Sequence, residues 1–178
     1  MSLHRPLERF RVVYAILSML SAAVLWQAAA AAGPLAKPTG PVILTVTGTI
    51  SETNAPGRAE FDEKMLDALG LESLTTTTNW TDGKQVFEGV RVSKLLDAVG
   101  AKGTTLAAVA LDDYTSTIPI EMLTKYPALF AVSMNGKALT PRDKGPVWIV
   151  LPRDEYPELQ DSRYDTYWVW QLKSIVVK

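Results

Sequence analysis

Two adjacent carboxylates followed by a tyrosine, at Asp112, Asp113 and Tyr114, have residue types that suit acid-base catalysis. A tyrosine hydroxyl can hydrogen-bond a substrate oxygen, and neighbouring carboxylates can accept and return protons. Aspartates at the end of a strand also form tight turns, because their side chains bond to nearby backbone groups. We therefore take Tyr114 and Asp113 as candidate catalytic residues and keep a turn as the alternative interpretation.

The loop Arg142-Asp143-Lys144-Gly145 suits the binding of an anion. An arginine can bind a phosphate or carboxylate through two parallel hydrogen bonds, and the backbone amides of a flexible loop can close around it. The alternative is a solvated loop without a ligand. Arg142 and Lys144 are the candidate binding residues.

Four consecutive threonines, Thr75 to Thr78, precede Asn79 and Trp80. Their hydroxyls can line a ligand pocket, but a run of threonines is also typical of a half-exposed strand. Trp80 can stack on a planar heterocycle or belong to the core. Trp168 and Trp170 are two positions apart, so we expect them on one face of a strand, in the core or as a stacking platform.

The residue types that are missing limit the chemistry. The chain has no cysteine, and its one histidine is His4. Disulfides, cysteine nucleophiles, Cys/His zinc sites and imidazole-based triads are therefore excluded for the part of the chain after His4. The acidic residues Asp154, Glu155, Asp161 and Asp165 do not have the spacing of a calcium loop, which favours a solvated loop. We expect no metal site.

The N-terminus has the order of a signal peptide. Three arginines precede an apolar run at 12–26, and small residues follow it at 27–33. The run is shorter than the roughly 20 residues of a membrane-spanning helix. We predict a cleavable signal peptide at 1–32 and a periplasmic or secreted protein. An uncleaved N-terminal membrane anchor is the alternative.

Charge and length narrow the classes of partner. The whole chain has a formal charge of −1, and residues 1–32 carry three Arg and one Glu, so the remainder has a charge of −3. Nucleic-acid binding is not expected, because it needs a basic face. The length after the signal suits one domain, at 42–178, preceded by a Pro- and Gly-containing extended leader at 33–41.

The elements that must position these residues alternate between short strands and short helices. Period-two patterns and turn signals predict strands at 42–50, 106–111, 115–118, 128–134, 147–151 and through 168 and 170 to 177. Residues 74–80 and 85–90, joined by the turn Asp82-Gly83, are predicted to form a hairpin or an extended loop. Apolar residues at helical spacing predict helices at 61–69, 93–99 and 120–126. Asn135-Gly136 is a strong hairpin signal. Because no regular βαβ alternation occurs, we predict an α+β domain with a mixed sheet and short helices.

Four motifs occur in order between residues 43 and 177. They are Phe87-Glu88-Gly89-Val90 before Leu95-Leu96; Asp113-Tyr114-Thr115-Ser116-Thr117-Ile118-Pro119-Ile120; Met134-Asn135-Gly136-Lys137-Ala138-Leu139 with Pro141-Arg142-Asp143-Lys144-Gly145-Pro146; and the C-terminal tryptophan segment. Together they resemble the molybdopterin-binding domain of the sulfite oxidase family, especially its small exported single-domain members.

The resemblance implies a pocket for a pyranopterin dithiolene, with molybdenum also held by a cysteine thiolate from the segment before the aromatic-x-Gly-Val motif. Here that segment is Thr75 to Trp80, and it has no thiol. A threonine hydroxyl stays protonated and is a poor ligand for molybdenum. The cofactor-binding positions that the resemblance implies are Thr76, Thr77, Thr78, Trp80, Arg142 and Lys144.

These observations favour an exported ligand-binding, sensory or accessory module without the Cys-ligated molybdenum centre. We expect a small anionic or heterocyclic ligand, and another envelope protein as partner. The alternative is a molybdopterin-dependent oxidoreductase with an atypical metal site. A third class, a hydrolase that uses Asp112, Asp113 or Glu155, rests on composition alone.

Overall fold

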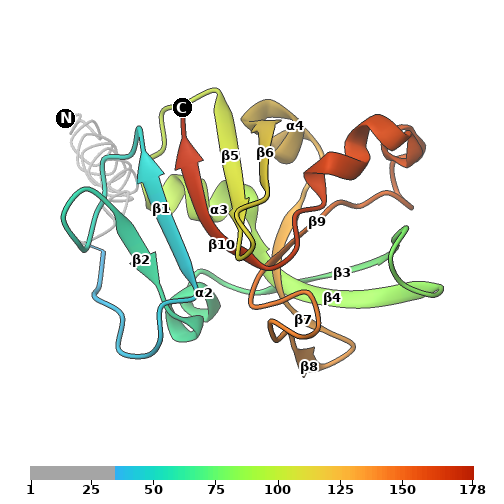
Figure 1. Cartoon of the computed structure of the whole chain (residues 1–178), viewed down its shortest axis with the longest axis horizontal. Coiled ribbons are helices and arrows are strands. Elements are labelled where there is room, and N and C mark those ends of the chain that lie inside the picture. The colour runs from blue at the N-terminus through green and yellow to red at the C-terminus, as the bar shows by residue number, and fades with distance from the viewer. Residues whose placement is uncertain (1–34) are drawn as a thin grey trace, which may run out of the picture. The chain divides into compact units, whose positions relative to one another are not determined.

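Two five-stranded β-sheets form the frame of residues 35–178, the part of the chain that the computed structural model describes (Figure 1). The first sheet contains, in spatial order, β2 (Ala59–Phe61), β1 (Leu44–Gly48), β10 (Leu172–Val177), β5 (Thr105–Ala110) and β6 (Thr115–Pro119). The C-terminal strand, β10, lies in the middle of this sheet. It is parallel to β1, and the other pairs in the sheet are antiparallel.

The second sheet is built from hairpins. Its strands are β3 (Glu72–Thr77), β4 (Lys84–Arg91), β7 (Leu129–Met134), β8 (Lys137–Ala138) and β9 (Trp148–Val150), of which β8 and β9 both pair with β7. Asn135 and Gly136 have positive φ angles of 52° and 73° between β7 and β8. The Asn-Gly pair therefore forms the hairpin that the sequence predicts.

In the described part of the chain, three short α-helices connect the strands: α2 (Glu63–Ala68), α3 (Val92–Ala98) and α4 (Ile120–Lys125). Two 3₁₀ helices, η1 (Pro157–Gln160) and η2 (Ser162–Tyr167), precede β10. Buried side chains from both sheets, such as Val46, Ile175, Phe87 and Phe130, belong to one hydrophobic cluster. The arrangement confirms the predicted mixed α+β class.

The aromatic-x-Gly-Val motif has a steric explanation. Gly89 lies in β4 beside β7, where the strand register shifts between Glu88 and Gly89. A Cβ atom at this position would overlap the backbone carbonyl oxygen of Phe130. Since real Cβ atoms do not approach backbone that closely, only glycine lets the two strands pair here. Phe87 and Val90 are fully buried on either side of it.

The structure corrects the boundaries of two predicted elements. Phe61 belongs to β2, where it pairs with Leu44, and the helix begins only after Asp62. The Asp62 carboxylate accepts a hydrogen bond from Met65 N at 2.9 Å and caps α2. Asp62 also accepts from the backbone amides of Thr39 and Gly40, and these donors lower the pKa of its carboxyl.

The second correction concerns the C-terminal tryptophans. Trp168 caps η2 and Trp170 follows it, so neither lies in β10. Gln171 has a positive φ of 50°, which interrupts an extended backbone just before the strand begins. The acidic stretch that was expected as a solvated loop instead contains η1 and η2.

Within residues 35–178, no helix combines the length and the apolar character needed to cross a bilayer. The predicted signal peptide at residues 1–32 lies outside the described residues and stays a prediction.

Candidate functional site

A cavity of about 370 Å³ lies where three segments meet: the turn between β5 and β6, the residues after β3, and the segment from η2 to β10. This volume is within the usual range of about 300–1,000 Å³ for small-molecule sites. The lining residues are Trp80, Ala110, Asp112, Tyr114, Asp165, Thr166, Trp168, Val169 and Trp170. Three indoles, one phenol and two carboxylates thus surround one space.

The indoles support one another. The ring centroid of Trp80 is 5.7 Å from that of Trp168 and 5.3 Å from that of Trp170. Trp148 is fully buried, with its centroid 6.3 Å from Trp168 and 6.5 Å from Trp170. Tilted and edge-to-face contacts at these distances are favourable and hold the rings in place. Trp168 is buried, whereas Trp80 and Trp170 are only half-buried.

The two carboxylates of the cavity are held by uncharged donors. Asp112 Oδ1 accepts a hydrogen bond from Tyr114 N at 3.1 Å, and Asp165 Oδ1 accepts one from Asn79 Nδ2 at 2.9 Å. Within residues 35–178, neither carboxylate forms an ion pair. A carboxylate has about four acceptor positions. Each therefore retains acceptor capacity for a ligand.

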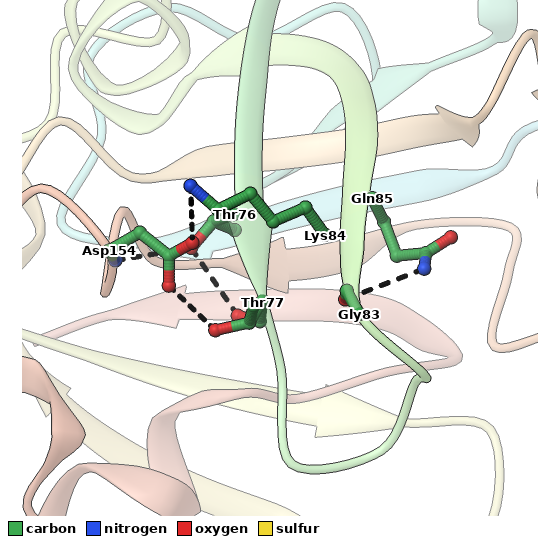
Figure 2. Close-up of polar contacts among 6 residues, drawn as sticks. All are labelled: Thr76, Thr77, Gly83, Lys84, Gln85 and Asp154. Carbon is green, nitrogen blue, oxygen red and sulfur yellow. Dashed lines mark hydrogen bonds and ion pairs between the residues drawn. The ribbon is translucent and has the colours of Figure 1, made fainter.

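The threonine segment precedes Trp80 of the cavity lining, and its hydroxyls are used by the fold itself; Figure 2 shows Thr76 and Thr77 bonded to Asp154. Thr77 Oγ1 donates to Asp154 Oδ1 at 2.6 Å, and Asp154 N donates to Thr76 Oγ1 at 3.3 Å. Lys84 Nζ lies 3.5 Å from Asp154 Oδ2. The hydrogen bond from Thr77 and the charge of Lys84 lower the pKa of the Asp154 carboxyl. We call these four residues, Thr76, Thr77, Lys84 and Asp154, the threonine clamp.

Thr78 also makes its contacts inside the fold. Its hydroxyl shares a 2.8 Å hydrogen bond with that of Thr81 and accepts another from Trp80 N at 3.0 Å. None of Thr76, Thr77 and Thr78 is among the residues that line the cavity. Of the six predicted cofactor-binding residues, Trp80 alone lines it.

The predicted anion-binding residues lie elsewhere. Arg142 is exposed on the loop after β8, and it is not part of the cavity lining. Lys144 comes closer, with Nζ 5.7 Å from the ring centroid of Trp148 and 5.5 Å from that of Trp170. Its backbone carbonyl accepts from Gln171 N at 2.8 Å, which ties the loop to the segment before β10. Lys144 therefore contacts the aromatic cluster without lining the cavity.

The structure separates the two candidate catalytic residues. Tyr114 lines the cavity and is 48% exposed. Asp113 has a φ of 67° in the turn between β5 and β6, and its Oδ1 is 2.5 Å from Lys173 Nζ. The hydrogen bond and charge of Lys173 lower the pKa of Asp113. Asp113 thus has the turn geometry that was the alternative interpretation, and it does not line the cavity.

Sequence reasoning did not bring Asp165 to this site. Its hydrogen-bond donor Asn79 is 86 positions away in the chain, and no local pattern links the two. The spacing of Trp168 and Trp170 did point to this site, since a stacking platform was one of the two interpretations of that pair. In the structure both act as walls of the cavity and also contact the core.

The thiolate-bound molybdenum that the resemblance implies does not fit this donor set. The chain has no cysteine, and in residues 35–178 no three His, Cys, Asp or Glu side chains are grouped to hold a metal ion. The hydroxyls of Thr76, Thr77 and Thr78 are already hydrogen-bonded within the fold. The cavity beside them carries two carboxylates and no lining Lys or Arg, which disfavours an anionic pyranopterin dithiolene.

The chain matches a protein-family model. The family model described as the oxidoreductase molybdopterin binding domain matches residues 54–155, more than half of the 178-residue chain. No match was found among curated proteins. The matched region includes the threonine clamp, Trp80, Asp112 and Tyr114, and ends before Asp165. The chain therefore belongs to the oxidoreductase molybdopterin binding domain family.

Proposed function

We propose that this protein is a ligand-binding member of its family, which uses the tryptophan-lined cavity to bind a small planar heterocycle. The observation that carries the proposal is the convergence of Trp80, Trp168 and Trp170 on one cavity. In the cell envelope, where the predicted signal peptide would deliver it, the protein would act as a sensory or accessory module for another envelope protein.

The aromatic walls suit this role physically. Exposed faces on half-buried indoles offer stacking surface, and the contacts among the rings fix their positions before a ligand arrives. Binding to preformed walls avoids much of the entropic cost of ordering side chains. The apolar body of a flat ring would replace water against Trp80 and Trp170.

The direct test is a titration of the full-length protein with quinoline, followed by tryptophan fluorescence and calorimetry. We expect Trp170→Ala to weaken quinoline binding about 10-fold, because it removes one wall of the cavity. Tyr156→Ala is the matched control, since Tyr156 is also a half-buried aromatic residue but does not line the cavity. Equal loss in both variants, or no binding to the wild type, would refute the proposal.

A second candidate, a molybdopterin-dependent oxidoreductase with an atypical metal site, is favoured by the family match alone. Its test is the molybdenum and pterin content of the protein purified from the envelope of a host that makes the cofactor. Elemental mass spectrometry measures the molybdenum content, and fluorescence of the oxidised pterin measures the pterin content. We expect neither above background, and near-stoichiometric amounts of both would establish the oxidoreductase instead.

A further inference from the structure

We propose that the ligand of this cavity is an aromatic cation, a planar ring system that carries a permanent positive charge. This inference rests on the proposed function and names the chemical class of its ligand. It follows from the charges that line the cavity, from the aromatic faces beside them, and from the way both are held.

The charged lining of the cavity is entirely negative. Asp112 and Asp165 are its two ionisable acids, and no lysine or arginine is among the lining residues. The neighbouring acid Asp113 differs, because Lys173 neutralises it at 2.5 Å. Within residues 35–178, Asp112 and Asp165 have no such partner. Asp112 is exposed and Asp165 is half-buried, so a cation bound in the cavity would meet two carboxylates that no basic side chain of the described residues neutralises.

The aromatic walls favour the same sign. The face of an indole carries the negative side of its quadrupole, and tryptophan is the strongest of the aromatic residues in binding cations. Lys144 already places its ammonium 5.5 Å from the centroid of Trp170. The rings of Trp148 and Trp170 thus already contact one cation of the protein itself. The charge of Lys144 also offsets part of the negative charge of the two carboxylates.

Both carboxylates are positioned before a ligand binds. The backbone amide of Tyr114 donates one hydrogen bond to Asp112, and the side-chain amide of Asn79 donates one to Asp165, which orients each carboxylate. Arg153 donates to Asn79 Oδ1, and its guanidinium forms no ion pair with Asp165 among the described residues. Charges fixed in advance discriminate between ligands of opposite sign without the cost of reorganisation.

Three probes that share one ring system test the inference: N-methylquinolinium, which is a cation; quinoline, which is neutral at mildly alkaline pH; and quinaldate, an anion. In titrations of the full-length protein, we expect the cation to bind about 10-fold more tightly than quinoline, and quinaldate to bind more weakly than either. Increasing salt should weaken binding of the cation and leave quinoline nearly unaffected.

Asp112→Asn and Asp165→Asn test the origin of the preference. Each keeps an oxygen acceptor and removes one charge, so we expect each to lower the affinity ratio of N-methylquinolinium to quinoline about 3-fold. Asp97→Asn, an exposed aspartate of α3 outside the cavity, is the matched control and should leave the ratio unchanged. The salt dependence of the wild type gives the same information if a variant fails to fold.

The outcomes separate the two proposals. Equal affinity for the cation and for quinoline, or tightest binding of quinaldate, would overturn the cation inference and leave heterocycle binding standing. Failure of all three rings to bind would overturn both. A preference for the cation that the Asp97→Asn control retains and the two cavity variants reduce would establish the inference.

Discussion

The threonine clamp and the tryptophan-lined cavity are neighbours in sequence and in space, yet they use their polar atoms differently. In the clamp, Asp154 is bonded to Thr76 and Thr77 and lies near Lys84. In the cavity, Asp112 and Asp165 have one uncharged donor each and, among residues 35–178, no ion-pair partner. The difference is one of placement as well as bonding: Asp154 Oδ2 is buried without a hydrogen bond, whereas Asp112 and Asp165 line a cavity and keep free acceptor positions there.

This contrast bears on the family as well. The segment from which the resemblance implies a metal ligand is, in this chain, an internal brace between the β3–β4 hairpin and the turn after β9. The cavity opens immediately after that segment, at Trp80. A chain of this family can therefore lack the thiolate and still have an aromatic-lined cavity next to the same segment.

The largest effect is expected at the residue that serves both core and cavity. Trp168→Ala should lower the free energy of unfolding by about 3–5 kcal/mol, because the indole is 2% exposed and contacts Trp80 and Trp148. Urea denaturation followed by circular dichroism measures it. Trp168→Phe, which keeps an aromatic ring, should cost less. A loss below about 1 kcal/mol for the alanine variant would contradict the packing described here.

The clamp should affect stability but not binding. Thr77→Val keeps the shape of the side chain and removes the donor to Asp154, which should lower the free energy of unfolding by about 1.5 kcal/mol. Quinoline affinity should stay the same. Thr75→Val, at an exposed threonine of the same strand, is the control and should change stability by less than about 0.5 kcal/mol. Weaker quinoline binding in Thr77→Val would contradict the prediction that the clamp affects stability alone.

Trp80 sharpens the comparison because it contacts both regions. Its backbone amide bonds to Thr78, whereas its ring lines the cavity. Trp80→Ala removes only the ring, so quinoline binding should weaken about 10-fold. The exchange rate of the backbone amide at position 80, compared by NMR between the wild type and Trp80→Ala, reports on the hydrogen bond to Thr78. If Trp80→Ala showed faster amide exchange at residues 76–78 and unchanged affinity for quinoline, the Trp80 ring would serve the clamp and not the cavity.

The smallest effect is the pH dependence of the clamp. The pKa of Asp154 is lowered below its ordinary value of 3.8, so the ionised carboxylate stabilises the fold above that pH. This contribution is lost as the pH falls through the lowered value. The difference in unfolding free energy between wild type and Thr77→Val should therefore be constant near neutrality and shrink below pH 3.8. A difference independent of pH in urea denaturation would show that Thr77 does not act through the Asp154 charge.

Local patterns predicted most of the strands and hairpins. The Asn135-Gly136 hairpin, the threonines of β3 and the helix before Gly100 follow from residue preferences that act within a few positions. The errors occur where a single local contact overrides the pattern. Asp62 caps α2 and leaves Phe61 in a strand, and the positive φ of Gln171 keeps Trp168 and Trp170 out of β10.

The sequence by itself determined the absence of a thiolate, the mixed α+β class and the motifs that mark the family. Those properties depend on residue types and short spacings. The tertiary structure alone decided which polar groups remain open to a ligand. It paired Thr77 with Asp154, and it brought Asp165 and Trp168 to Trp80 from the other end of the domain. Such contacts depend on strand pairing between distant segments, which no local pattern specifies.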